Sequence, residues 1–171
     1  MILERHTGLK YAVEFTPLTQ KDLSTLTKRN GWTFGKRQWE AYLGQSGVFP
    51  VKMTRAHHNE IEGIVVYRDQ PDIEGLFILW IEGAPKNRNF KGNGELSFDH
   101  IAENLFAYVC MCSAQKGYNY FIALQSKGNP VLNAFYKQLG FVEFPFDRYM
   151  GMYTVAAKSL VEVYLLEEER G

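Results

Sequence analysis

The sequence predicts an α/β (α+β) fold in which helices cover a mixed β-sheet, and three observations support this fold class. Several short segments rich in apolar and β-branched residues have the pattern of strands, and other segments have helical periodicity. Short polar turns join early strands, as in antiparallel hairpins, whereas helices join the later ones. The 171 residues suit one domain, 1–171, and 46% hydrophobic with 22% charged residues is typical of folded proteins.

The first half of the chain is expected to contain four strands and two helices. Pro17 ends the first strand, and Thr19 with Asp22 has the capping-box spacing that begins the first helix. The second helix covers residues 36–43. The continuous apolar run 76–81 predicts a central strand that is buried on both faces. The expected strands comprise residues 11–15, 48–53, 61–67 and 76–81.

The second half is expected to alternate between helices and strands. Helical periodicity covers residues 101–116, and Gly117 marks the end of that helix. A second helix covers residues 131–139 and is closed by Gly140. The remaining elements are strands at 120–124, 141–146 and 149–155 and a terminal helix at 156–169.

The composition argues against several classes of protein. The chain has 19 Lys and Arg against 19 Asp and Glu, and this zero net charge argues against a dedicated nucleic-acid binder. Cys110 and Cys112 have the spacing of neither a disulfide framework nor a zinc site, and His57 and His58 lie in a polar turn without further ligands. The N-terminus lacks the apolar region of a signal peptide, and no apolar run reaches the ~18 residues of a membrane span. We expect a cytoplasmic protein with no metal and no membrane partner.

A cationic, glycine-containing loop connects a predicted strand to the next predicted helix. Lys86, Arg88 and Lys91 lie between Glu82 and Glu95 without an intervening acid. A helix N-terminus after such a loop can hold a pyrophosphate, because its first N–H groups are unpaired and the helix dipole is positive there. A solvated surface loop is one alternative. Contact of the same three cations with RNA or DNA is another.

The segment from Asn129 to Phe141 reads Asn-x6-Tyr-x3-Gly-Phe, with Tyr136 and Gly140 at the inner positions. Here the sequence resembles the GNAT superfamily of acyl-CoA-dependent N-acetyltransferases, whose penultimate helix follows an Asn and carries a Tyr before Gly-Phe. The resemblance implies a largely antiparallel central sheet of about six to seven strands with helices on both faces. It also implies direct transfer of an acetyl group from acetyl-CoA, as co-substrate, to a primary amine in a ternary complex.

The family's phosphate-binding motif, Gln/Arg-x-x-Gly-x-Gly/Ala, fits this chain in two registers. Residues 89–94 supply the glycines but would make the following helix unusually long. His100 to Ala102 occupies the Gly-x-Ala end at the expected interval before Gly117, so this register is favoured, with 92–99 as an insertion. Ser97 then stands first and His100 replaces a glycine. The cofactor-binding positions that the resemblance implies are Ile81, Lys91, Gly92, His100, Ile101, Ala102, Asn129 and Tyr136.

The same resemblance implies two catalytic residues. Tyr136 would protonate the leaving CoA thiolate, because a phenol keeps its proton near neutral pH. A tyrosine packed in the core is the alternative. Glu82, where the family's splayed strand opens, would deprotonate the amine, and an ion-paired glutamate at a strand end is the alternative. Asn129 would bind the pantetheine arm, cap its helix, or do both.

The acceptor is expected to be a small-molecule or protein amine, and no feature of the chain selects between them. Trp32, Trp39 and Tyr42 form either a wall of the acceptor site or part of the core, and their helical spacing favours the core. The alternative function is a non-catalytic GNAT-fold module that binds acyl-CoA or a protein, motivated by Ser97 and His100 in the phosphate motif. The sequence is compatible with a monomer or a homodimer.

Overall fold

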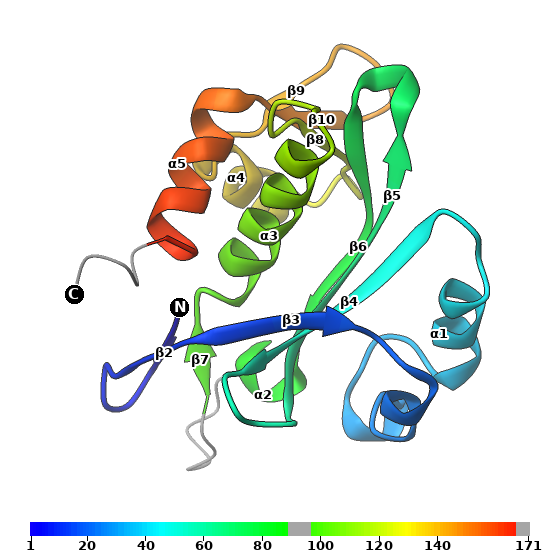
Figure 1. Ribbon diagram of the computed structural model, residues 1–171, viewed down its shortest axis with the longest axis vertical. Coiled ribbons are helices and arrows are strands. Elements are labelled where there is room, and N and C mark those ends of the chain that lie inside the picture. The colour runs from blue at the N-terminus through cyan, green and yellow to red at the C-terminus, as the bar shows by residue number, and fades with distance from the viewer. Residues whose placement is uncertain (89–96, 167–171) are drawn as a thin grey trace. The chain divides into compact units, whose positions relative to one another are not determined.

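The computed structural model describes residues 1–88 and 97–166 (Figure 1). These residues pack into two compact units, each with its own buried core. Unit 1 comprises Met1–Val66 and Trp80–Leu105, and unit 2 comprises Tyr67–Leu79 and Phe106–Gly171. The assignment of one domain to residues 1–171 stays a prediction.

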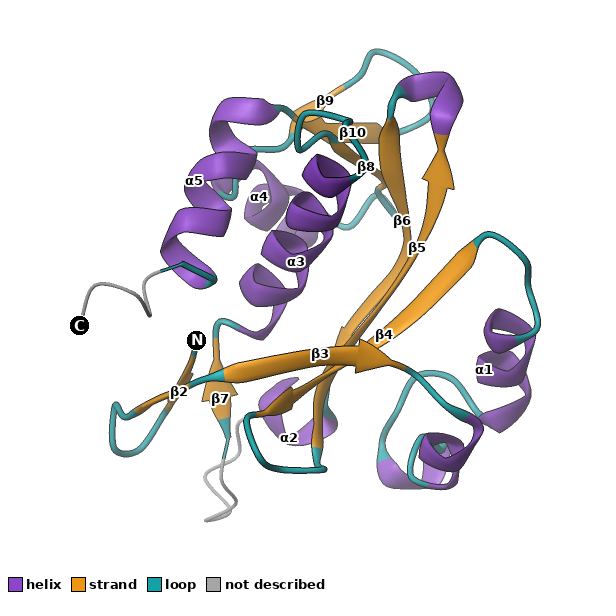
Figure 2. Cartoon of the chain, viewed as in Figure 1, coloured by secondary structure: helices purple, strands orange, loops and turns teal. Residues whose placement is uncertain are grey.

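Seven strands form one sheet in the order β3-β4-β5-β6-β8-β10-β9 (Figure 2). The pairs β3–β4, β8–β10 and β9–β10 are antiparallel, whereas β6 and β8 pair in parallel from Leu76↔Ile122 to Ile78↔Leu124. The predicted mixed, largely antiparallel sheet flanked by helices is therefore confirmed. Its strands are β3 (Val13–Pro17), β4 (Val48–Arg55), β5 (Ile61–Gln70), β6 (Gly75–Gly83), β8 (Ile122–Gln125), β9 (Val142–Glu143) and β10 (Tyr149–Met152).

Unit 1 contains a second, three-stranded sheet in the order β2-β1-β7. Its strands, β1 (Ile2–Glu4), β2 (Lys10–Tyr11) and β7 (Phe98–Asp99), have two or three residues each, too few for a periodicity that would predict β1 or β7. The predicted strand 11–15 is divided between the sheets, because Tyr11 pairs with Ile2 whereas Val13 pairs with Arg55.

The helices follow the predicted order closely. The helix predicted at 36–43 has those bounds, and the one predicted at 101–116 ends one residue earlier. The first predicted helix is a 3₁₀ helix, whose start is fixed by the Asp22 carboxylate accepting a hydrogen bond from the Thr19 N–H at 2.7 Å. The helices are η1 (Gln20–Ser24), η2 (Lys28–Asn30), α1 (Lys36–Leu43), η3 (Pro71–Ile73), α2 (Pro85–Arg88), α3 (Ile101–Gln115), α4 (Pro130–Gln138) and α5 (Thr154–Tyr164). No helix within 1–88 or 97–166 is long and apolar enough to cross a membrane.

The core of unit 1 brings the start of α3 directly onto β5. Leu23 of η1 and Trp39 of α1 are completely buried in this unit. Gly63 of β5 has no room for a side chain, because a Cβ there would lie 2.8 Å from Cγ2 of Ile101 and 3.0 Å from Cδ1 of Leu105. This close approach sets the position of the N-terminus of α3 within unit 1.

The core of unit 2 lies between its strands and α3. Cys110 Sγ of α3 is 4.0 Å from Met152 Sδ of β10. Leu76 and Ile78 of β6 are buried, but Phe77 between them is only half-buried. The expectation that this strand is buried on both faces is therefore wrong, because the face carrying Phe77 is covered only in part.

Candidate functional site

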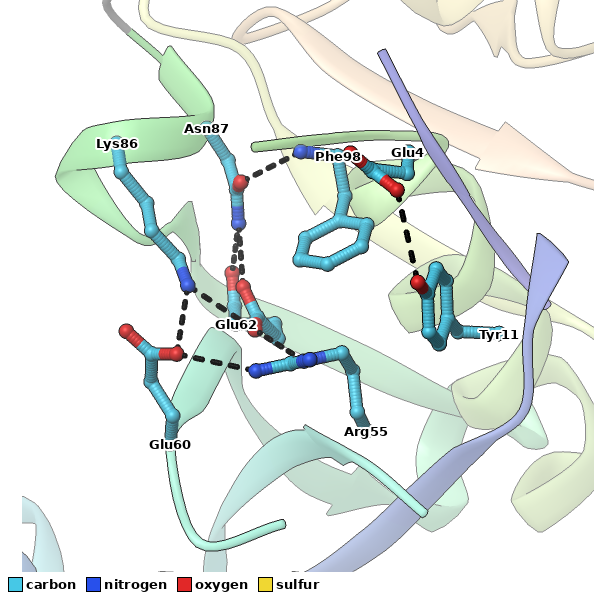
Figure 3. Close-up of polar contacts among 8 residues, drawn as sticks. All are labelled: Glu4, Tyr11, Arg55, Glu60, Glu62, Lys86, Asn87 and Phe98. Carbon is cyan, nitrogen blue, oxygen red and sulfur yellow. Dashed lines mark hydrogen bonds and ion pairs between the residues drawn. The ribbon is translucent and has the colours of Figure 1, made fainter. Parts of the chain in front are cut away.

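A completely buried carboxylate, Glu62 of β5, organises one end of unit 1 (Figure 3). It accepts hydrogen bonds from Arg55 Nε and Lys86 Nζ, both at 3.1 Å, and from Asn87 Nδ2 at 2.9 Å. A buried carboxylate without partners is very unfavourable, so these three donors account for its place in an apolar strand.

A second acid, Glu60, lies at the edge of the same cluster and is about half exposed. Its carboxylate forms ion pairs with Arg55 Nη2 at 3.3 Å and Lys86 Nζ at 2.9 Å. Burial opposes its ionisation, but the hydrogen bond and charge of Lys86, assisted by Arg55, outweigh burial and lower the pKa of Glu60. Both cations lie over the face of the Phe98 ring, with Arg55 Cζ 5.2 Å and Lys86 Nζ 5.6 Å from its centroid.

Asn87 connects this cluster to the strand that precedes α3. Its side-chain carbonyl accepts from the Phe98 N–H at 2.8 Å, while its Nδ2 donates to the backbone carbonyl of Glu62 at 3.1 Å. In the same part of unit 1, the Tyr11 hydroxyl donates a hydrogen bond to the Glu4 carboxylate at 3.5 Å (Figure 3). The network therefore fixes α2, β5 and β7 to one another within unit 1.

The network changes the interpretation of the cationic loop. Lys86 is paired with Glu60 and Glu62, and Arg88 Nη1 lies 2.9 Å from the carboxylate of Glu82. The expectation that Lys86 and Arg88 supply uncompensated positive charge is therefore wrong, because acids from elsewhere in the fold pair with both. Lys91 and Gly92, two of the predicted cofactor-binding residues, lie outside the described residues.

Glu82, the predicted base, is almost completely buried near the end of β6. Its Oε1 accepts from Thr33 N at 2.9 Å and Thr33 Oγ1 at 2.7 Å, in addition to the ion pair with Arg88. Its Oε2 accepts from Trp80 Nε1 at 3.0 Å. Arg88 Nη2 also donates to the Gly31 carbonyl at 2.6 Å, so Glu82 and Arg88 together hold the segment before α1 against β6.

An aromatic group lies beside this carboxylate in unit 1. The Phe34 ring is tilted by 31° against Trp80 at a centroid distance of 4.1 Å, and it lies 6.1 Å from Tyr42. These three side chains are half-buried, whereas Trp32 and Trp39 belong to the core. The expected helical spacing does not relate the two, because Trp32 lies before α1, and the core position expected for Tyr42 is wrong. Phe34 and Trp80 are not among the predicted site residues, although Trp80 shares a strand face with Glu82.

The N-terminus of α3 follows a residue in a left-handed conformation. His100 has φ +67, the region that favours glycine, and α3 begins at the next residue. Residues 98 and 99 form β7, so α3 does not extend back to residues 89–94. The start of α3 at Ile101 agrees with the helix start expected for the His100–Ala102 register. His100 Nδ1 lies 3.5 Å from the Glu103 carboxylate.

The predicted positions on β6 and α3 are neighbours within unit 1. A Cβ on Gly83 would lie 3.4 Å from Cγ2 of Ile101, so the end of β6, with Ile81 and Glu82, adjoins the first turn of α3 with Ile101 and Ala102. The first N–H groups of a helix have no partner within it and can bind an anion. These donors fit the pyrophosphate of a CoA-type co-substrate.

Ser97 adds one further polar group near this turn. Its Oγ is buried and has no hydrogen-bond partner among the described residues, although it stands at the first position of the favoured motif register. Within residues 1–88 and 97–166, no three His, Cys, Asp or Glu side chains are grouped as metal ligands.

Tyr136 belongs to unit 2, where α4 carries it among aromatic rings. Its ring lies edge-on to Phe106 at 6.0 Å and 5.7 Å from Phe141. Burial raises the pKa of its hydroxyl, so the phenol holds its proton at neutral pH. The apolar residues of α4 are not part of the core, and Val131 is 78% exposed.

Asn129, also in unit 2, performs the capping role weighed for it. Its Oδ1 accepts from Val131 N at 2.9 Å and Leu132 N at 3.2 Å, which satisfies two N–H groups at the start of α4. Its amide nitrogen can still donate to a ligand, so capping leaves the predicted pantetheine contact available.

No family model and no curated protein matches the sequence. Similar solved structures include a probable GNAT-family acetyltransferase from Chromobacterium violaceum, with a TM-score of 0.66 and 13% identity over 88% of this chain and 87% of that one. A spermidine N-acetyltransferase chimera from Vibrio cholerae and hSSAT has a TM-score of 0.62 and 15% identity over 86% and 98%.

The ribosomal-protein-S18-alanine N-acetyltransferase from Escherichia coli is also similar, with a TM-score of 0.53 and 14% identity over 82% of this chain and 92% of that one. The chain therefore has the fold of the GNAT acetyltransferases.

Proposed function

We propose that the protein is an N-acetyltransferase that transfers the acetyl group of acetyl-CoA directly to a primary amine. The observation that carries this proposal is Tyr136 on an Asn-capped α4 within a GNAT fold. The chemistry requires a neutral amine, a stabilised oxyanion and a proton for the departing thiolate.

Tyr136 is the proposed proton donor. Burial raises its pKa, so its hydroxyl is protonated at neutral pH and can give its proton to the thiolate as the thioester bond breaks. The N–H groups at the start of α3, with Ile81 and Asn129, are the proposed contacts of the CoA moiety. Lys91 and Gly92 remain proposed contacts by resemblance to the family.

Glu82 is the proposed base, acting directly or through water. A base is needed because a lysine-like amine has a pKa of ~10.4, so it is protonated at neutral pH and loses a proton before it attacks the thioester. Three donors already occupy its Oε1 and one occupies Oε2, which favours proton transfer at Oε2. The aromatic group of Phe34, Tyr42 and Trp80 beside it is the proposed apolar wall for the acceptor.

The acceptor is proposed to be a small-molecule or protein amine. The similar structures include a spermidine N-acetyltransferase chimera and a ribosomal-protein-S18-alanine N-acetyltransferase, which supports an amine of either size. The competing function is a non-catalytic acyl-CoA-binding module. Location in the cytoplasm, a monomeric or dimeric state and the absence of nucleic-acid binding stay predictions.

The first experiment separates these functions. Acetyl-CoA is expected to raise the melting temperature, and an amine panel is expected to release free thiol only if the protein is an enzyme. Tyr136→Phe should lower kcat about 100-fold or more, because proton donation contributes about 10²–10⁴-fold. Tyr120→Phe, which removes a hydroxyl elsewhere in unit 2, is the matched control. Full turnover by Tyr136→Phe would exclude the proposed acid.

A second experiment distinguishes a base from a positioning residue at Glu82. Glu82→Gln should lower kcat by about 100-fold if the carboxylate takes the proton. Thr33→Val removes one donor to Oε1 but leaves the carboxylate, so it should change kcat less than about fivefold. If both variants instead raise KM for the amine equally and spare kcat, Glu82 positions the segment before α1 and is not the base.

A further inference from the structure

Unit 2 contains an aromatic cavity of about 630 Å³ that none of the predicted site residues lines. Its volume lies within the range of about 300–1,000 Å³ that is typical of small-molecule sites. The principal walls of this aromatic cavity are Phe77, Phe121, Phe144, Phe146, Tyr149 and Tyr153.

The small Ala123 of β8 is one of the residues that line the aromatic cavity. Ala123 of β8 pairs with Phe77 of β6 on one side and with Gly151 of β10 on the other. A Cβ on Gly151 would lie 2.7 Å from Phe144 Cζ, and one on Gly75 would lie 2.5 Å from Phe121 Cδ1. Both glycines therefore let aromatic rings lie against the backbone, and the small Ala123 leaves space between them.

The aromatic rings line the cavity but stay partly exposed to solvent. Phe121 lies 5.2 Å from Tyr153, and Phe77 lies 5.9 Å from Tyr149 at an interplanar angle of 65°. Phe146 is 63% exposed and Tyr153 is 53% exposed, although both side chains are large and apolar for most of their surface. Such a group of partly exposed rings is typical of a surface that binds a flat apolar ligand.

Arg68 gives the aromatic cavity its charge preference. Its guanidinium lies 5.2 Å from the centroid of Phe77, and its Nε donates to Gln70 Oε1 at 3.0 Å. Within residues 1–88 and 97–166, Arg68 forms no ion pair, so its terminal nitrogens remain available for a bidentate contact with a carboxylate. Asp69 is already held by Lys116 at 2.7 Å and by the Tyr118 hydroxyl at 2.8 Å.

We propose that the aromatic cavity binds a planar aromatic carboxylate, with the ring between the aromatic walls and the carboxylate on Arg68. Among the described residues that line the cavity, Glu74 is the one acid, and it lies on an exposed turn with φ +47. An ammonium ligand would find the aromatic faces and Glu74 but would be repelled by the Arg68 charge, which makes the carboxylate the better match.

The test uses three probes of the same ring system: 2-naphthoate, 2-naphthol and 2-naphthylmethylammonium. Two-dimensional NMR titration of the full chain should show 2-naphthoate binding at a roughly millimolar or tighter dissociation constant, with shifts at Phe77, Ala123 and Tyr149. Arg68→Gln should weaken 2-naphthoate about fivefold and leave 2-naphthol unchanged. Arg37→Gln, an exposed arginine of unit 1, is the matched control and should change neither.

Tyr153→Ala should weaken both 2-naphthoate and 2-naphthol, because it removes a wall common to both. The proposal is overturned if the ammonium probe binds more tightly than 2-naphthoate, or if Arg68→Gln leaves 2-naphthoate unchanged. It is also overturned if light scattering gives a dimer that Phe146→Ala dissociates, since a second copy would then occupy the surface. The titration requires no acetyl-CoA, so it is independent of the proposed transferase activity.

Discussion

Replacing Glu62 by glutamine tests whether the buried network holds unit 1 together. The side chain of Glu62 is completely buried, and those of Arg55 and Lys86 are only 11% and 13% exposed. Glutamine has nearly the same shape but no charge, so both cations lose their buried counter-charge. Glu60 remains as a partner of each cation, but its side chain is 54% exposed.

The expected loss of stability follows from these contacts. Removing one partner of a buried ion pair costs about 3–5 kcal/mol, and the retained pairs with Glu60 place Glu62→Gln near the lower limit, about 3 kcal/mol. For a chain of this size, 1 kcal/mol corresponds to about 2–4 °C, so the melting temperature should fall by about 6–12 °C. Glu60→Gln, at the exposed edge, should cost less than about 1 kcal/mol.

Tryptophan fluorescence during urea unfolding is a suitable assay because all three tryptophans, Trp32, Trp39 and Trp80, belong to unit 1. A double-mutant cycle adds Lys86→Met to Glu62→Gln, and the lysine change should cost at least about 1 kcal/mol less in that background. The reasoning is refuted if Glu62→Gln unfolds within about 1 kcal/mol of wild type, or if the cycle shows no coupling between the two positions.

Two further predictions concern other contacts. Burial opposes ionisation of Asp22, but hydrogen bonds from Lys52, at 2.6 Å, and from Thr19 outweigh it and lower the pKa of Asp22 below its ordinary value of 3.8. The Asp22–Lys52 pair therefore stabilises the folded protein fully at pH values above 3.8, and this contribution is lost as the pH falls through the lower pKa of the folded state. Lys52→Met should lower the free energy of unfolding by about 1 kcal/mol at pH 7. Denaturation curves should show this cost disappearing in acid, and a constant cost would contradict the linkage. A Cβ on Gly140, which has φ +102, would lie 2.6 Å from the Cβ of Ala156, whereas one on Gly117 would lie in open space. Gly140→Ala should therefore lower the free energy of unfolding by about 2–3 kcal/mol, and Gly117→Ala by about 1 kcal/mol. Equal losses of stability, measured by circular dichroism, would exclude the clash.

The elements that could be predicted are those with a local periodicity. The helix at 36–43 has the predicted bounds because its apolar spacing and the glycines on either side are local signals. The strand predicted at 141–146 forms only at Val142–Glu143, since hydrogen bonding to β10 decides its extent. Short strands such as β7 depend entirely on a partner elsewhere in the chain, so no local pattern predicts them.

The same distinction applies to the candidate site. The resemblance places Asn129 at the start of α4 and Tyr136 within it, and of the roles expected for them the structure shows only the cap at Asn129. The ion pairs of Lys86 and Arg88 could not be predicted from the loop itself, because the acids that pair with them come from β5, the turn before it and β6. Glu62 within the apolar run 61–66 was an available signal, since a charged residue in a buried strand requires partners.

The outermost strands of the two sheets are short, and this affects how the protein associates. The edge strands β3, β9, β2 and β7 have five residues or fewer, and β3 ends at Pro17, which has no N–H to donate. The ten-residue β5, in which seven residues are buried, is enclosed by strands on both sides. Folded molecules therefore offer little backbone for strand addition, and aggregation on heating should begin only when unfolding releases β5.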